Sequence, residues 1–167
     1  MKDLAILLSR IVTHSSSKLR AMHSSEWEFR KAPSKSAQAD PCPTSFIVDG
    51  RRASSGGWSK KEILGHMVDS AANNHQRFVR GQYADKTPIS YSGDTWVKVQ
   101  DYNSANIKML IELWIHYNLH LSHVISKIPA DKLGVLFSAD AKEPVTLEWL
   151  VKDYVRHLEH HLSQIID

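Results

Sequence analysis

The fold is decided by residues 58–78, which read WSKKEILGHMVDSAANNHQRF. Ser59 stands three residues before Glu62, the spacing of a capping box that satisfies the free amide groups at the start of a helix. The apolar residues after it recur at helical intervals and form one stripe: Ile63, Leu64, Met67, Ala71 and Phe78. The stretch therefore predicts an amphipathic helix that begins after Ser59 and continues to about Arg80.

Three further segments have helical periodicity. The first runs from about Leu4 to Phe29, and another runs from about Tyr102 to Ile128, just before Pro129. The last begins at Thr146, a residue suited to the N-cap position, and continues to the end of the chain. Four helices without a convincing strand pattern predict an all-α fold, a four-helix bundle that residues 1–167 form as a single domain.

Two of the connections between these helices are long. Residues 33–57 are rich in Ser, Ala, Pro and Gly and are typical of a loop between the first and second helices. A polar and aromatic connection runs from Gly81 to about Asp101 and joins the second helix to the third. Both connections are expected to be irregular.

The composition is that of an ordinary soluble globular protein, with 42% apolar and 23% charged residues. The formal net charge is +3, and Lys and Arg are dispersed rather than gathered in one stripe, so no nucleic-acid partner is expected. The apolar run at residues 4–8 is too short for a signal peptide or a membrane span. The single cysteine, Cys42, cannot form an internal disulfide or a CxxC metal site, and the expected location is the cytoplasm.

The ten histidines are the unusual feature of the composition. A helix advances about 100° per residue, so each histidine can be placed relative to the apolar stripe of its helix. In the last helix His161 falls inside the stripe, His157 lies one turn earlier at its edge, and His160 points away from the core. His157 and His161 can therefore bind one ion, although an HxxxH pair taken alone is also typical of surface or packing histidines.

The second helix carries a polar line along one flank of its apolar stripe, formed by His66, Ser70, Asn73 and Arg77. One interpretation is a partly exposed helix edge, where such residues need no partners. The other is the wall of a cleft, with His66 as a third metal ligand and the remaining side chains available to a bound molecule. Position in the helix does not separate the two interpretations.

His116, His120 and His123 in the third helix form a rival cluster. His116 and His123 lie off the apolar stripe, toward solvent or a neighbouring subunit, and His120 is a borderline case. Ligands that point outward cannot share a closed pocket, so this cluster is the weaker candidate for a metal site.

The run from Trp58 to Phe78 and the closing His157-Leu158-Glu159-His160-His161 resemble the DinB-like superfamily, and within it the YfiT-like branch of metal-dependent hydrolases. The resemblance covers nearly all of the chain from Trp58 onward. It implies a four-helix bundle in which His66, His157 and His161 hold one divalent ion such as zinc or nickel, and it implies a homodimer. In the family, the segment similar to residues 27–33 leads directly into the Trp-Ser helix start. Here residues 36–56 intervene, and they are expected to form an inserted flexible loop.

Three histidine ligands with an open position are typical of a catalytic ion, which activates water or binds and ionises a thiol. The resemblance therefore implies a hydrolase or a low-molecular-weight-thiol S-transferase that acts on a small-molecule substrate. Ser70, Asn73 and Arg77 are candidates to orient water or substrate, Arg77 by receiving a carboxylate. Asp153, one turn before His157, either orients that imidazole or is a favourable charge early in the helix. The alternative function is a non-enzymatic, metal-binding, stress-associated interaction protein whose ion ties the helices together.

Overall fold

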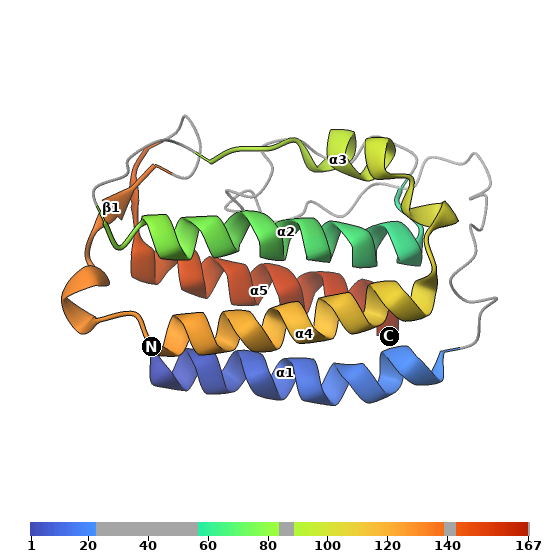
Figure 1. Cartoon of the computed structure of the whole chain (residues 1–167), viewed down its shortest axis with the longest axis horizontal. Coiled ribbons are helices and arrows are strands. Elements are labelled where there is room, and N and C mark those ends of the chain that lie inside the picture. Colours follow the sequence, from blue (N-terminus) through green and yellow to red (C-terminus); the bar gives the residue numbers. More distant parts are fainter. Residues whose placement is uncertain (23–56, 84–88, 139–142, 167) are drawn as a thin grey trace.

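The computed structural model describes residues 1–22, 57–83, 89–138 and 143–166. Within these residues four long helices lie side by side, and a short helix runs along the outer side of the bundle (Figure 1). The long helices are α1 (Lys2–Ala21), α2 (Lys60–Arg80), α4 (Ile107–Ser126) and α5 (Leu147–Ile166), and the short one is α3 (Gly93–Gln100). The predicted all-α four-helix bundle is confirmed, while the insertion at residues 36–56 lies outside the described residues.

The long helices α2 and α4 run in the same direction, although they follow one another in the chain, and α1 and α5 run the opposite way (Figure 1). A helix of 20 residues such as α4 is about 30 Å long, so the connection from α2 has to return along the whole bundle. It returns past α2 and carries α3 and the 3₁₀ turn Tyr102–Ser104. Because α2 is antiparallel to α5, the first turns of α2 lie beside the later turns of α5.

The start signals read from the sequence are present as hydrogen bonds. The Ser59 hydroxyl accepts from the Glu62 amide at 3.1 Å, and the Glu62 carboxylate accepts from the Ser59 amide at 2.7 Å. At the start of α5 the Thr146 hydroxyl accepts from the amide of Trp149 at 3.1 Å. The capping box of α2 and the N-cap of α5 are therefore confirmed, and they fix where both site-bearing helices begin.

Two helix boundaries differ from the expectation. The first helix ends at Ala21, and Met22 after it is extended, while residues 23–29 of the expected helix lie outside the described residues. The third long helix begins at Ile107 rather than near Tyr102, because the Asn106 side chain accepts from the Met109 amide at 3.2 Å and takes the N-cap position.

The connection from Gly81 to Asp101, expected to be irregular, contains α3. Ser92 is its N-cap, and the Ser92 side chain accepts from the Thr95 amide. A pair of two-residue antiparallel strands, β1 (Leu136–Phe137) and β2 (Val145–Thr146), also departs from the expectation of helices alone. Short elements of this kind lack the length that a periodic pattern needs, so the sequence did not indicate them.

Each long helix turns an apolar stripe toward the centre of the bundle, where the stripes form one core. Among the described residues, no helix combines the length and the apolar character that a membrane span requires. The largest fully buried side chains of the core include Trp114, Tyr154, Phe78, Leu64, Met67 and Leu121.

The ring of Tyr102 packs directly on α2 at Gly65. A Cβ atom placed on Gly65 would lie 2.2 Å from the ring Cδ2. One turn further along α2, Asp69 Oδ1 accepts from the Tyr102 hydroxyl at 2.5 Å and from Gln100 Nε2 at 2.8 Å. The missing side chain of Gly65 therefore lets the returning connection close on α2 beside His66.

Replacing Gly65 with Ala should destabilise the fold, because the new Cβ overlaps a ring that is held by its hydroxyl. We expect a loss of about 1–3 kcal/mol in the free energy of unfolding, measured by urea denaturation. Gly134→Ala is the matched control, because a Cβ there meets nothing within 4 Å. Equal effects of the two changes would contradict the close approach at Gly65.

Candidate metal centre

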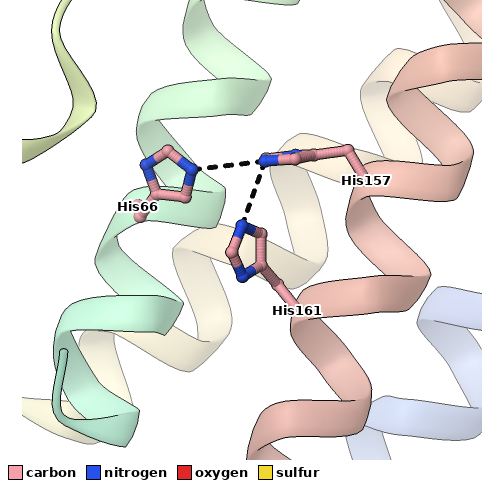
Figure 2. A group of neighbouring side chains, drawn as sticks. All are labelled: His66, His157 and His161. Atoms are coloured by element: carbon pink, nitrogen blue, oxygen red, sulfur yellow. Dashed lines mark hydrogen bonds between the residues drawn. The ribbon is translucent and has the colours of Figure 1, made fainter. Parts of the chain in front are cut away.

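Three histidines from two helices meet inside the bundle. His66 lies in the second turn of α2, and His157 and His161 lie one turn apart in α5. Figure 2 shows their rings pointing toward one another across the space between the two helices. The helical phase read from the sequence, which turned His157 and His161 inward, therefore places them together with His66.

The ring nitrogens of these residues converge on one point. His157 Nε2 lies 3.3 Å from His66 Nε2 and 3.0 Å from His161 Nε2 (Figure 2). One potential ligand atom from each of the three residues lies within 4.8 Å of the others. A zinc ion about 2.0–2.1 Å from each ligand in a tetrahedron separates two nitrogens by about 3.3–3.4 Å. The spacing of the imidazoles thus fits a single ion.

All three imidazoles are withdrawn from solvent, with 2%, 3% and 7% of His66, His157 and His161 exposed. Burial, and to a lesser degree His161, holds the pKa of His66 well below its ordinary value of 6.5. Burial, followed by the neighbouring histidines, lowers the pKa of His157 in the same way. Burial also lowers the pKa of His161 to about 4, against a raising contribution from its hydrogen bond to Gln164. The rings are neutral at pH 7, the form that binds a metal.

The outer nitrogens of the three rings differ in their partners. His161 Nδ1 lies 2.7 Å from Gln164 Oε1, and His157 Nδ1 lies 3.4 Å from the Ser70 hydroxyl. His66 Nδ1 is buried and has no hydrogen-bond partner among the described residues. In the described part of the chain, the group of possible ligands contains these histidines and no carboxylate or thiol.

The polar line on α2 is not a partly exposed helix edge. His66, Ser70, Asn73 and Arg77 are 2%, 0%, 4% and 1% exposed, so that interpretation is wrong. Asn73 Nδ2 donates to the carbonyl of Asp69 at 2.9 Å. Arg77 Nε and Nη2 both donate to the main-chain oxygen of Ile89, at 3.1 and 2.5 Å. Ile89 lies in the returning connection. Direct contact between these side chains and a substrate stays a prediction.

The other candidates lie away from the three-histidine cluster. His116, His120 and His123 are exposed, and within the described residues they do not come together as a ligand group. The rival cluster of the third helix is therefore not formed. Asp153 is 2% exposed, and its Oδ1 accepts from Arg156 Nη2 at 3.0 Å.

Aromatic side chains flank the cluster, and no pattern in the sequence had indicated a role for them. The Trp58 ring lies 4.6 Å from the His66 ring and 6.4 Å from the His161 ring, centroid to centroid. The Tyr91 ring lies 6.4 Å from His66 and contacts Trp96 at 5.1 Å. Trp58 directly precedes the N-cap of α2, and this position in the sequence could have indicated that its ring lies near His66. Tyr91 is brought in by the path of the returning connection, which no local pattern indicates.

Comparisons with known proteins agree with this fold. The sequence profile of the DinB superfamily matches residues 9–165. The chain is 28% identical over 118 residues to "Putative metal-dependent hydrolase YfiT" of Bacillus subtilis, a match that covers 67% of this chain and 64% of that protein. It is 26% identical over 113 residues to "Putative metal-dependent hydrolase" of Geobacillus thermodenitrificans, covering 66% and 64%. The chain thus spans less than two thirds of the length of these relatives.

Solved structures show the same fold. The structure of YfiT from Bacillus subtilis, described as "a probable metal-dependent hydrolase with an unusual four-helix bundle topology", superposes with a TM-score of 0.73 at 20% identity. That superposition covers 98% of this chain and 83% of YfiT. A mycothiol-dependent maleylpyruvate isomerase superposes with a TM-score of 0.70 at 13% identity, covering 99% of this chain and 60% of the isomerase.

The metal-free protein should lose stability as the pH falls from about 6.5 toward 4. The pKa values of the three histidines are lowered in the folded state, so the unfolded chain binds more protons in this window. Each such histidine contributes a slope of up to about 1.4 kcal/mol per pH unit to the free energy of unfolding. Urea denaturation in the presence of a chelator, between pH 7 and 5, measures the slope.

Two leucine variants serve as a matched pair for this measurement. His161→Leu should flatten the slope, because it removes a buried imidazole, and His123→Leu, which removes an exposed imidazole, is the control for the substitution itself. Identical slopes in the parent and His161→Leu would contradict the assigned burial effect.

Proposed function

The chain belongs to the DinB superfamily, and from that premise we propose that it is a divalent-metal-dependent enzyme. In this proposal one ion is held by His66, His157 and His161. The observation that carries it is the convergence of three buried, neutral imidazoles on a space the size of one ion. Without a ligand, one Nε2–H would have to serve the two other Nε2 atoms, which leaves buried polar groups only partly satisfied, an arrangement that is costly.

The donor set indicates the kind of ion and its role. Imidazole nitrogens suit zinc and nickel, and an ion with three protein ligands keeps a position open, as catalytic ions do and structural ions do not. An ion bound there would supply Lewis acidity, which lowers the pKa of a water or thiol and polarises an electrophile. The chain's own part is to hold the imidazoles neutral and oriented, and to exclude bulk water by burying them.

Side chains around the cluster suggest how a small substrate is received. Trp58 and Tyr91 flank the imidazoles of α2 and α5 and offer apolar ring faces. Ser70 lies against His157 and supports that ring. Arg77, whose guanidinium bonds the carbonyl of Ile89, fixes the returning connection that carries Tyr91. Asn73, buried one turn beyond Ser70, is the remaining candidate to orient a substrate.

Two reaction classes follow from the open position, hydrolysis and transfer of a low-molecular-weight thiol. The first is supported by the names of the two bacterial relatives, and the second by the mycothiol-dependent isomerase with the same fold. We expect the zinc- or nickel-loaded protein to turn over a member of a panel of esters and amides, assayed with and without low-molecular-weight thiols. Turnover that consumes the thiol and joins it to the product identifies a transferase, and turnover that needs no thiol and consumes water identifies a hydrolase.

The alternative function is a non-enzymatic, metal-binding, stress-associated interaction protein. Its support is that the ligands come from α2 and α5, which are far apart in sequence, so that an ion would tie the bundle together. The two functions differ in what removal of the ion does. A structural ion predicts unfolding on chelation, whereas a catalytic ion predicts loss of turnover in a protein that stays folded by circular dichroism.

Variants of two neighbouring histidines test metal binding itself. His161→Ala removes a ligand and should abolish stoichiometric metal, measured by elemental analysis of the purified protein. His160→Ala should retain stoichiometric metal, because His160 is not among the ligands of the cluster and its contact with Gln164 bears on affinity and not on the number of ligands. Loss of the ion in His160→Ala with retention in His161→Ala would overturn the assignment of the ligands.

A further inference from the structure

The carboxamide of Gln164 lies between two histidine rings of α5. Its Oε1 is 2.7 Å from His161 Nδ1, and its Nε2 is 3.2 Å from His160 Nε2. Gln164 follows His161 by three positions and His160 by four, so both rings are within reach on one side of the helix. An amide oxygen only accepts hydrogen bonds and an amide nitrogen only donates them. In this arrangement the amide oxygen faces the His161 ring and the amide nitrogen faces the His160 ring.

This orientation sets the tautomer of His161. Because Gln164 Oε1 accepts, His161 Nδ1 carries the hydrogen, and the lone pair of the neutral ring is on Nε2. His161 Nε2 is the atom that lies 3.0 Å from His157 Nε2, on the inner side of the cluster. A reversed amide would present its N–H groups to Nδ1 and move the ring hydrogen to Nε2, where it blocks coordination. In the observed orientation His160 Nε2 accepts from the amide nitrogen at the same time.

We propose that Gln164 is a positioning residue, which holds His161 as the Nδ1–H tautomer with its Nε2 lone pair presented to the metal. Its contact with His161 Nδ1, at 2.7 Å, is shorter than the 3.4 Å contact of His157 Nδ1 with Ser70, and His66 Nδ1 has no hydrogen-bond partner among the described residues. The role toward a metal rests on the proposed function. The tautomer is a property of the metal-free chain and does not depend on it.

The first measurement reads the tautomer directly. In the metal-free protein at pH 7.5, the ¹⁵N chemical shifts of the His161 ring distinguish a protonated Nδ1 from a protonated Nε2. We expect the parent to show Nδ1–H, Gln164→Met to lose this preference, and Gln164→Glu to retain it, because a carboxylate also accepts. Gln164 is exposed, so the variants should fold as the parent does. A parent in the Nε2–H form, or an unchanged tautomer in Gln164→Met, would overturn the proposal.

The second measurement is the affinity for zinc, determined by competition with a chromophoric chelator. Loss of such a supporting hydrogen bond weakens metal binding by about 10–100-fold, and this is the drop expected for Gln164→Met. Gln164→Glu should bind at or above the parent's affinity, and Ser163→Ala, an exposed neighbour without a ring contact, is the matched control. Equal affinities of Gln164→Met and parent would count against Gln164. A parent that binds no zinc would overturn the proposed function, while the tautomer measurement would still decide the role of Gln164.

Discussion

Burial of three imidazoles against one another is the constraint on which the site and much of the bundle depend. Each ring loses the hydrogen bonds of water, and their facing nitrogens cannot all be satisfied by one another, because neutral imidazole has one donor and one acceptor. Such a cluster is stable in a core only if an outer partner or a shared ligand compensates it. Gln164 and Ser70 provide outer partners for His161 and His157. The converging Nε2 atoms are left for a ligand.

The topology of the bundle brings the rest of the site to that cluster. Because α2 and α4 run in the same direction, the chain between them returns along α2 instead of turning back at once. The turn at Tyr102 closes on Gly65 and Asp69, within one turn of His66 on either side. Arg77 holds the other end of the same connection at the carbonyl of Ile89. The returning segment, pinned at both ends, is what places Tyr91 beside His66.

Helical periodicity was enough to predict the bundle and the placing of His161 inside the apolar stripe with His157 at its edge, because both depend only on the 3.6-residue repeat and an apolar stripe. The family resemblance named the same residues from a different signal. Periodicity did not show whether the polar line on α2 forms the wall of a cleft or an exposed helix edge, since its burial depends on which segment packs against it. It also missed α3, which is short, and the partner of Arg77, which is 12 residues away across a reversal of the chain. Gln164 had the right spacing from His161, but spacing does not reveal which amide atom faces the ring.

The charge of the surroundings bears on what the open position would prefer. Three neutral imidazoles bring no negative charge, and no carboxylate is among the potential ligands in the described residues. Of the buried carboxylates near them in sequence, Asp69 accepts from Tyr102 and Gln100 through Oδ1, and Asp153 accepts from Arg156 through Oδ1. The cationic Arg77 is close enough to lower the pKa of His157. If the proposed divalent ion binds here, no ligand charge would offset its own, and it would lie in a medium of low dielectric, where electrostatic attraction is strong. The open position of such an ion would favour an anionic ligand, a thiolate or a carboxylate, over a neutral one.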